Sequence, residues 1–422
     1  MLHHPPPATA RPAGPARGAA PAEVLTTVDR ARAYVAAGAL RYGAATRTGA
    51  ELEFTVHHAD DPCRQLTAAV LTAALGPHAP AGLGGPAAPL PRGGRVTVEP
   101  GGQVEISTPP YADLDELLAA TDADLAHLAD LVGRHGLALG RSGLDPHRPP
   151  HPVLASPRYD AMAAAYARSG PAGGIMMRST AGLQVCLDAG DRSEAAERWR
   201  LAHLLGPPLL AAFATADRHA GRPTGRASAR MCAWLDIDVG RTDPVWTVAA
   251  ADVPPATAWA AYALAAPLLC LRRPGGDWTA PPGTTFADWI EGALPGPPTT
   301  ADLEYHLSTL FPPVRPRGYL EIRYLDAQPA DAWAPPVLAL CALLATPAIR
   351  AEAARLCAPA ADRWRRAARA GLADPVVGPA ARAVLALAID GLAALDLPEP
   401  RRAAARVSIA ARLGTAGAGG AG

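Results

Sequence analysis

The stretch Val98-Glu99-Pro100-Gly101-Gly102-Gln103-Val104-Glu105-Ile106-Ser107 predicts two short strands joined by a Pro-Gly-Gly turn. Successive side chains of a strand point to opposite faces, so Val104 and Ile106 share one face and Glu105 lies on the other. The first arm has the same alternation and ends in Glu99. Carboxylates crowded on a half-buried sheet repel one another unless a cation neutralises them. The hairpin therefore predicts a metal site.

The composition of the whole chain narrows the class of protein. The 422 residues have room for one large domain or two to three ordinary ones, and the formal net charge is zero. This balance gives no support for nucleic acid or an anionic membrane as a partner. The chain contains no lysine and no asparagine. Without lysine there is no Walker A loop and no Schiff-base chemistry, so two common routes to nucleotide binding and covalent catalysis are excluded.

Cysteine spacing and the terminal segments indicate a cytoplasmic protein. The six cysteines lie far apart without a CxxC pair, which fits a reducing compartment. Residues 1–22 are rich in Pro, Ala, Gly and Arg and lack an apolar core, so we expect a disordered leader and not a signal peptide. The longest apolar run, 334–345, is too short to span a bilayer and predicts a buried helix. Residues 396–422 are expected to be a mostly disordered tail.

Between these ends, short strand patterns alternate with long helical ones, which predicts an α+β fold. Hairpin-like arms favour an antiparallel sheet over a doubly wound parallel one. We expect residues 23–395 to form a single domain, of which 330–395 is a helical C-terminal part. The expected strands, besides the hairpin, are 48–57, 176–188 and 318–325. The expected helices are 21–40, 64–75, 114–131, 193–216 with a break near Pro207, 256–271, 285–292 and 300–310.

Polar residues recur at period two on four of the strand segments. They are Glu51 and Glu53, Glu99 and Glu105, Gln184, and Glu321 with Arg323. A solvated sheet face explains any one of these patterns, because alternation alone predicts it. The combination favours a shared metal-binding face, since glutamate is a poor strand former and the flanking residues are apolar enough for central strands.

An all-oxygen set of ligands favours a hard cation, Mg²⁺ or Mn²⁺, over zinc. Such cations, gathered by several carboxylates, typically handle phosphates. A guanidinium such as that of Arg323 holds a phosphate or carboxylate with two hydrogen bonds. These residues therefore point to ATP-dependent chemistry without a P-loop.

Several long motifs resemble the glutamate–cysteine ligases of the plant and bacterial type. The motifs are Glu99-Pro-Gly-Gly-Gln-Val-Glu105-Ile-Ser, Met176-Met-Arg-Ser-Thr-Ala-Gly-Leu-Gln-Val-Cys-Leu-Asp188 and Phe311-Pro-Pro-Val-Arg-Pro-Arg-Gly-Tyr-Leu-Glu-Ile-Arg323. The resemblance runs in the same order from about 48 to 325. With its lysine-free composition and modest length, the chain looks most like the actinobacterial branch that supplies γ-glutamylcysteine for ergothioneine.

The resemblance implies a fold and a reaction. The fold would be a glutamine-synthetase-like curved antiparallel sheet whose concave face holds metals. The reactants would be ATP, L-glutamate and L-cysteine, and the metal would be Mg²⁺ or, as the alternative, Mn²⁺. The γ-carboxylate would attack the γ-phosphate of ATP, and the amine of cysteine would then displace phosphate from the acyl phosphate. The enzyme would be a monomer or a homodimer.

The resemblance also implies roles for individual residues. Glu51, Glu53, Glu99, Glu105 and Glu321 would ligate the metals, and Gln184 occupies a position that contacts metal or phosphate in related ligases. The catalytic residues would be Arg323, which would contact the transferring phosphate or the glutamate, and Glu321. Arg178 and Thr180 would help to hold glutamate, while Arg230 and Trp234 match a segment near the substrate pocket.

The sequence is also compatible with two other functions. One is a related carboxylate–amine ligase that uses another amine. The other is a non-catalytic binding protein on the same fold, although a binder gains nothing from so much repulsion among glutamates.

Overall fold

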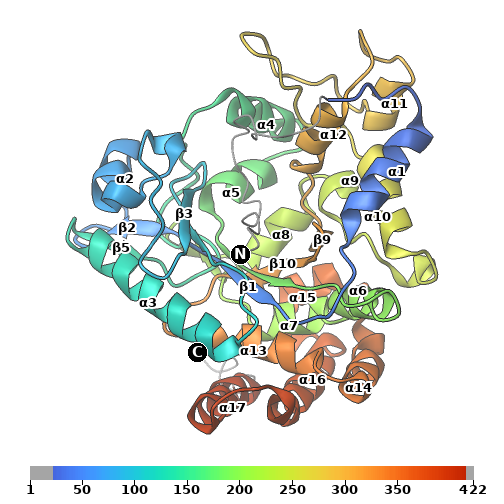
Figure 1. Cartoon of the computed structure of the whole chain (residues 1–422). Coiled ribbons are helices and arrows are strands. Elements are labelled where there is room, and N and C mark those ends of the chain that lie inside the picture. Colours follow the sequence, from blue (N-terminus) through green and yellow to red (C-terminus); the bar gives the residue numbers. More distant parts are fainter. Residues whose placement is uncertain (1–21, 415–422) are drawn as a thin grey trace, which may run out of the picture.

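The computed structural model describes residues 22–414, with a six-stranded antiparallel sheet at its centre (Figure 1). The strand order is β3-β4-β1-β6-β10-β9. These strands are β1 (Thr48–Phe54), β3 (Arg95–Val98), β4 (Val104–Ser107), β6 (Gly182–Leu187), β9 (Val314–Pro316) and β10 (Leu320–Asp326). Two small pairs accompany the sheet, β2 (Val56–His58) with β5 (Leu137–Leu139) and β7 (Arg218–His219) with β8 (Arg222–Pro223). The antiparallel sheet and the α+β class are confirmed.

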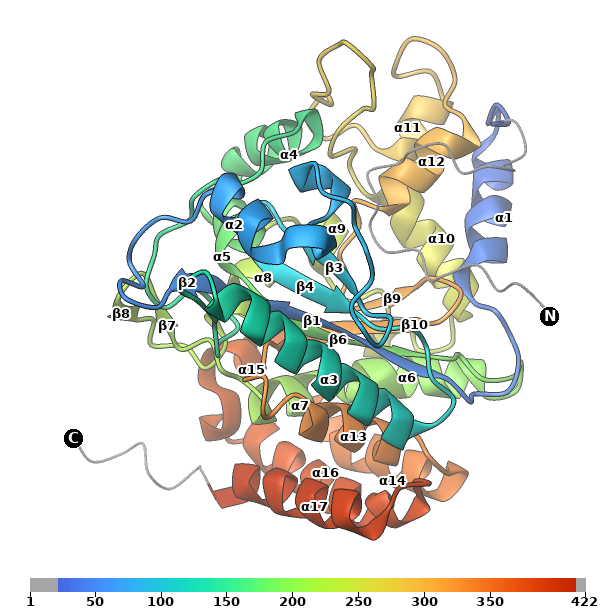
Figure 2. The same ribbon diagram turned by 60° about the vertical axis from the view of Figure 1, so that its left-hand side comes forward.

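Helices cover both sides of the sheet (Figures 1 and 2). On one side lie α6, α7 and α13 to α17, and on the other lie α4, α5, α8 and α12. The helices are α1 (Val28–Ala39), α2 (Ala68–Leu75), α3 (Leu114–Gly133), α4 (Pro157–Ala167), α5 (Ala172–Ser179), α6 (Ala195–Leu204), α7 (Gly206–Ala212), α8 (Ala229–Leu235), α9 (Val239–Thr242), α10 (Pro255–Ala265), α11 (Phe286–Ile290), α12 (Thr300–Leu307), α13 (Ala334–Leu343), α14 (Pro347–Cys357), α15 (Trp364–Ala370), α16 (Val377–Gly391) and α17 (Glu399–Gly414).

The two faces of the sheet differ in polarity because apolar and polar residues alternate along each strand. Leu52 pairs with Ile106 on β4 and with Leu183 on β6, so these buried side chains share one face. They belong to one continuous hydrophobic core that runs from Leu25 to Ile409. The glutamates occupy the opposite face.

The apolar helices near the C-terminus belong to this core. The predicted buried helix at 334–345 is α13, and all of its residues from Pro336 to Leu343 are buried. The segment 377–394, which includes α16, is long and apolar enough to cross a membrane. However, half of it is buried, and α16 packs against α7, α13, α14 and α17. Burial on several sides is typical of a core helix.

Local sequence signals explain where several helices begin. Asp113 caps α3 by accepting hydrogen bonds from the amides of Asp115 and Glu116. The predicted break near Pro207 is real, because α6 ends at Leu204 and α7 begins at Gly206. Proline is tolerated in the first turn of a helix, where its missing N–H would have no partner.

Some expectations from the sequence were wrong. The segment 176–188 was expected to be one strand, but its first part is the end of α5 and only Gly182–Leu187 is β6. Methionine is a good helix former, and the Thr180 hydroxyl closes the last turn by donating to the Met176 carbonyl at 2.7 Å.

The predicted disordered tail, 396–422, is also corrected, because it contains the helix α17. Alanine and arginine favour helix, and buried Ala405 and Ile409 attach α17 to the core. Residues 415–422, and residues 1–21 of the predicted leader, lie outside the described residues.

Candidate active site

The polar face of the sheet gathers the glutamates predicted from the sequence. Residues paired across antiparallel strands share a face, and the register pairs Glu53 with Glu105 and Glu51 with Gln184. Along the other edge of β6, and on the same face, Cys186 pairs with Glu321 on β10. Glu321 in turn pairs with Arg315 on β9. A continuous polar surface therefore crosses all six strands.

The half of this face formed by β3, β4 and β1, here called the acidic half, carries Glu51, Glu53, Glu99 and Glu105. Glu53 accepts hydrogen bonds from the Gly182 amide at 2.6 Å and from the Gln184 side chain at 2.9 Å. Glu105 accepts from the hydroxyls of Thr97 at 2.9 Å and Ser107 at 2.8 Å. These donors fix two of the four carboxylates, each through one or both of its oxygens.

The turn of the opening hairpin places Glu99 beside this cluster. The Glu99 amide donates to the Gln103 carbonyl at 2.8 Å, and Gly102 has a φ of 86°, which favours glycine. A Cβ at Gly101 would lie 2.1 Å from the Arg178 carbonyl oxygen, so only glycine fits there. Gln103 also donates to the Thr180 carbonyl at 2.9 Å. The turn is thereby fastened to the junction of α5 and β6.

Crowding and burial raise the proton affinity of the acidic half. Burial raises the pKa of Glu51 to about 7, with a further contribution from the charge of Glu321. Burial also raises the pKa of Glu99 to about 7, helped by Glu53. The pKa of Glu105 is raised well above its usual value by burial and by the charges of Glu51, Glu53 and Glu99. Glu51 and Glu99 therefore bind protons near neutral pH unless a cation replaces those protons.

The half of the face formed by β9 and β10, here called the basic half, has three arginines around one carboxylate. Glu321 is fully buried and pairs with Arg315 at 2.6 Å, Arg323 at 3.0 Å and Arg317 at 3.1 Å. Burial alone would raise the pKa of Glu321, but the three guanidiniums together hold it well below its usual range. This half therefore carries two net positive charges, three from arginines and one negative from Glu321.

Gln184 lies between the two halves. Its amide nitrogen donates to Glu53, and its oxygen accepts from Arg323. An amide can serve both neighbours because it has a donor and an acceptor at one end.

The structure also brings the predicted Arg230 and Trp234 to the basic half, from helix α8. Arg230 donates to the Arg323 carbonyl at 3.0 Å. The guanidiniums of Arg230 and Arg323 lie 5.3 and 5.7 Å from the centre of the Trp234 ring. The indole N–H donates to the Phe311 carbonyl at 2.8 Å and fixes the ring.

Arg178 and Thr180 are not brought to the carboxylates. The Thr180 hydroxyl bonds back to α5, and Arg178 lines a small cavity with Gly101, Asp145 and Arg148. The Arg178 Nε has no hydrogen-bond partner in the part of the chain that the structure describes. Their role in holding glutamate stays a prediction.

Three arginines of the site were missed from the sequence. Arg315 and Arg317 lie in Val-Arg-Pro-Arg-Gly, where their alternation before a glycine was the available signal. Arg158 approaches the acidic half from α4. It donates to the hydroxyl and the carbonyl of Ser308 at 3.0 and 2.9 Å, and its charge lowers the pKa of Glu99. Ser156-Pro157, a helix-start signal, could have placed it on a helix.

The donor chemistry of the acidic half fits a hard cation. All its side-chain ligands would be oxygens, and burial together with neighbouring carboxylates raises the pKa of Glu51 and Glu99, an effect that a bound cation would oppose. Among residues 22–414, no three His, Cys, Asp or Glu side chains are already gathered as a metal site.

A sheet that sets clustered carboxylates beside clustered guanidiniums is suited to a cation and anionic groups together, a combination typical of enzymes that transfer phosphate. Comparison with known proteins makes this specific: residues 47–411 match glutamate–cysteine ligase family 2. The chain is 41% identical over 390 residues to glutamate–cysteine ligase EgtA of Mycolicibacterium smegmatis, which covers 90% of this chain and 88% of that protein. It is 40% identical over 378 residues to EgtA of Mycobacterium tuberculosis, with 88% and 85% covered. The chain therefore belongs to glutamate–cysteine ligase family 2 and is an enzyme.

More distant matches agree. The chloroplastic glutamate–cysteine ligase of Brassica juncea is 32% identical over 240 residues, 56% of this chain and 46% of that protein. The crystal structure of a glutamate–cysteine ligase from Francisella tularensis in complex with AMP has a TM-score of 0.51 and 12% identity. It covers 89% of this chain and 83% of that one, and shows a shared fold.

Proposed function

We propose that this enzyme joins the γ-carboxylate of L-glutamate to the amine of L-cysteine, with ATP converted to ADP and phosphate. The observation that carries the proposal is the pairing of the acidic and basic halves on one face, in a chain whose relatives of similar length are named glutamate–cysteine ligases. An unactivated carboxylate does not acylate an amine at neutral pH, so the route would pass through γ-glutamyl phosphate.

The acidic half would hold the metal. Glu51, Glu53, Glu99 and Glu105 would be the ligands, and bound Mg²⁺ would neutralise phosphate oxygens as charge shifts during transfer. Glu53 and Glu105 are held in place by the Gly182 amide and by two hydroxyls, so less freedom is lost when they meet a ligand. Glu321 is not among the proposed ligands, because its oxygens already accept from three arginines.

The basic half would hold the transferring phosphate. Arg323 is aimed by Gln184 and Glu321, so its guanidinium is positioned before the substrate arrives. In the first step, an oxygen of the γ-carboxylate forms a bond to the γ-phosphorus of ATP as the bond to ADP breaks. In the second, the neutral amine nitrogen of cysteine bonds to the activated carbonyl carbon, phosphate leaves with its electron pair, and the nitrogen loses a proton that the departing phosphate can accept. The protein supplies position and charge to both steps and no covalent nucleophile.

The experiment that tests the reaction is phosphate release with ATP, Mg²⁺ and glutamate across a panel of amines. Release with cysteine, and little with alanine, serine or glycine, together with γ-glutamylcysteine as the product, is the expected outcome. Release with other amines but not with cysteine would instead indicate a related carboxylate–amine ligase. No release with any amine, despite binding of ATP, would favour a non-catalytic binding protein.

The names of the similar mycobacterial proteins support a place in ergothioneine synthesis. A cytoplasmic location would follow from that role and from the six free cysteines. Deletion of the gene should remove γ-glutamylcysteine-dependent ergothioneine from the cell, and restoration by the intact gene, but not by an inactive variant, would support the assignment.

A further inference from the structure

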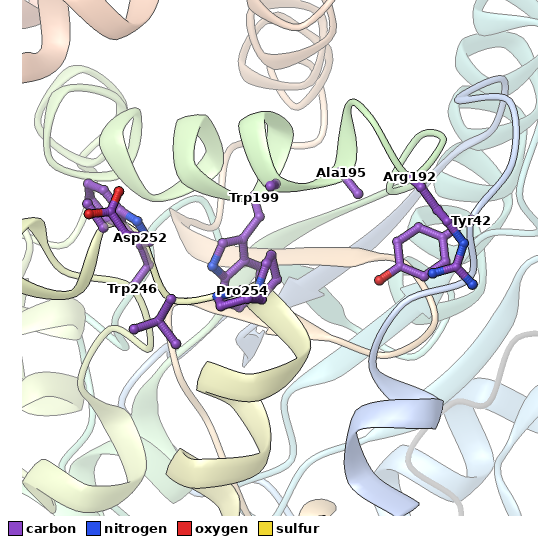
Figure 3. A pocket seen from close by; sticks show the side chains of 11 residues that line it. Tyr42, Arg192, Ala195, Trp199, Trp246, Asp252 and Pro254 are labelled. Atoms are coloured by element: carbon purple, nitrogen blue, oxygen red, sulfur yellow. The ribbon is translucent and has the colours of Figure 1, made fainter. Parts of the chain in front are cut away.

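A cavity of about 290 Å³ lies between α6 and the start of α10, and none of the site residues described above lines it (Figure 3). Trp199 and Trp246 are buried in its lining. The charged side chains of Arg192 and Asp252 are exposed and lie toward opposite ends, so they do not converge on one position. A small-molecule site places its polar groups around one position. The cavity therefore indicates no particular ligand.

The side chains of His78 and His127 do converge on one position, although the two residues lie 49 positions apart in the sequence. His78 ends the 3₁₀ turn Gly76–His78 that follows α2, and His127 lies in α3. The Nε2 atoms of the two rings are 3.3 Å apart. The rings meet edge to face, with their centres 5.3 Å apart. Both residues are only half-buried, so the pair is held by the fold and is still open to solvent.

The tautomer of His78 follows from its other ring nitrogen. His78 Nδ1 lies 3.0 Å from the Ala88 carbonyl oxygen, which can only accept a hydrogen bond, so Nδ1 carries the proton. In the neutral ring Nε2 then has a lone pair, and this lone pair faces His127. Metal-binding histidines are typically held in this way, with one ring nitrogen donating to a carbonyl and the other facing the metal.

The separation of the two Nε2 atoms matches that of two ligands on a tetrahedral ion. Zinc binds histidine nitrogen at about 2.0–2.1 Å, and two corners of such a tetrahedron lie about 3.3–3.4 Å apart. The observed separation is 3.3 Å, so the rings need little movement to bind one ion. Imidazole nitrogen suits zinc, whereas Mg²⁺ prefers the oxygen ligands of the acidic half.

We propose that His78 and His127 form a Zn²⁺ site, with water at the remaining positions. Without metal, His127 donates a hydrogen bond from Nε2 to the lone pair of His78. When zinc binds, that proton moves to Nδ1 of His127 through solvent, and both Nε2 lone pairs bind the ion in place of two water molecules. No net proton is released. Among residues 22–414, no third His, Cys, Asp or Glu joins the pair as a ligand.

An ion at this place would fasten the loop that leads into the hairpin of the acidic half. The loop 79–94 runs from His78 to the start of β3. Its far end is already held to α3, because Asp124 accepts from the amides of Arg92 at 2.7 Å and Gly94 at 2.8 Å. Asp124 and His127 lie three residues apart, on one face of α3. Zinc would attach the near end to the same face and would stabilise the fold by mass action.

The test is a calorimetric titration of the untagged protein with Zn²⁺, using His127→Gln and the control His135→Gln. His135 follows α3 closely and contacts the Leu131 carbonyl through its Nδ1 at 3.2 Å. The wild type and His135→Gln should each bind one zinc ion more than His127→Gln. His78→Gln should lose the same ion. All four proteins keep the acidic half, so zinc bound there does not affect the difference.

Three results would overturn the proposal. They are an equal number of zinc ions in the wild type and His127→Gln, a loss in His127→Gln that His78→Gln does not share, and an equal loss in His135→Gln. Nitrogen-detected NMR of the histidine rings provides a second measurement that needs no variant. In metal-free protein His127 should carry its proton on Nε2, and with Zn²⁺ both rings should carry it on Nδ1. Rings that keep the metal-free pattern at saturating Zn²⁺ also overturn the proposal.

Discussion

The two halves of the polar face solve opposite electrostatic problems. In the acidic half, four carboxylates lie together, and burial raises the pKa of Glu51 and Glu99 to about 7. In the basic half, Glu321 is more deeply buried, yet three arginines hold its pKa well below the usual range. Glutamate thus has two roles: in the acidic half it is available to bind a cation, and in the basic half it is the counter-ion of three arginines.

The largest effect on activity is expected when one carboxylate of the acidic half is removed. Glu105→Gln keeps the shape of the side chain but removes a negative charge, and we expect activity to fall by about 1,000-fold because a metal ligand is lost. Steady-state rates across a range of Mg²⁺ concentrations would measure this. The exposed Glu116→Gln is the matched control and should be near wild type. Full activity in Glu105→Gln would remove the acidic half from the mechanism.

Arg323→Ala tests the basic half. We expect kcat to fall by about 100-fold, because a pre-positioned charge on the transferring phosphate is lost. Arg323→Lys should recover little, since lysine lacks the planar fork that contacts Gln184 and Glu321 together. The exposed Arg141→Ala is the control, and thermal unfolding would report whether the variants are folded. Recovery by lysine would mean that charge alone matters here.

The Arg158→Ala variant tests whether an arginine from outside the sheet also contributes to the site. Arg158 and Arg272 lie 5.1 and 5.4 Å from the centre of the same Tyr305 ring, but only Arg158 lowers the pKa of Glu99. Arg158→Ala should therefore reduce kcat/KM by about 10-fold, and Arg272→Ala should have a smaller effect. Measuring KM for each substrate in turn identifies which anionic group Arg158 meets. Equal losses of kcat/KM in the two variants would indicate that both act through their contact with the Tyr305 ring.

The last prediction concerns protons and is measured by Mg²⁺ binding instead of turnover. The raised pKa values mean that the folded chain keeps protons on Glu51 and Glu99 that the unfolded chain has lost between about pH 4.5 and pH 7. Without a cation, this contribution makes the fold less stable as pH rises through that window. Mg²⁺ must displace the protons, so its apparent affinity should fall by about 30-fold per protonated carboxylate between pH 8 and pH 5.5. Calorimetry in buffers of different ionisation enthalpy would show proton release near pH 7. Binding without proton release would contradict these pKa values.

The acidic half was predictable from the sequence because its signal is local. Glu51, Glu53 and Glu105 alternate with apolar residues, and that alternation fixes a face whatever the strands pair with. Glu321 and Arg323 were found in the same way. The partners of Glu321 were not, because whether a buried glutamate meets a metal or arginines depends on the neighbouring strand.

The neighbouring strand is β9, and the prolines in and before it prevented its prediction from the sequence. Pro316 ends β9, and the Pro-Pro pair precedes its start, so the pattern did not read as a strand. Pro316 is tolerated because β9 is an edge strand with one neighbour. The helix α5 was missed because only a few polar residues separate Met177 from β6, and the hydrogen bond from Thr180 to Met176 that closes the last turn is seen only in the structure.

The hydrogen bond from the Gly182 backbone to Glu53 gives the molecule a built-in reporter. Glycine amides fall in a sparsely populated region of a nitrogen–proton correlation spectrum, so this resonance should be simple to follow. When a cation draws the Glu53 oxygen toward itself, the Gly182 signal should move, while amides on the apolar side of the same strand stay in place. In ¹⁵N-labelled protein, one peak would then report the occupancy of the acidic half without a variant or a turnover.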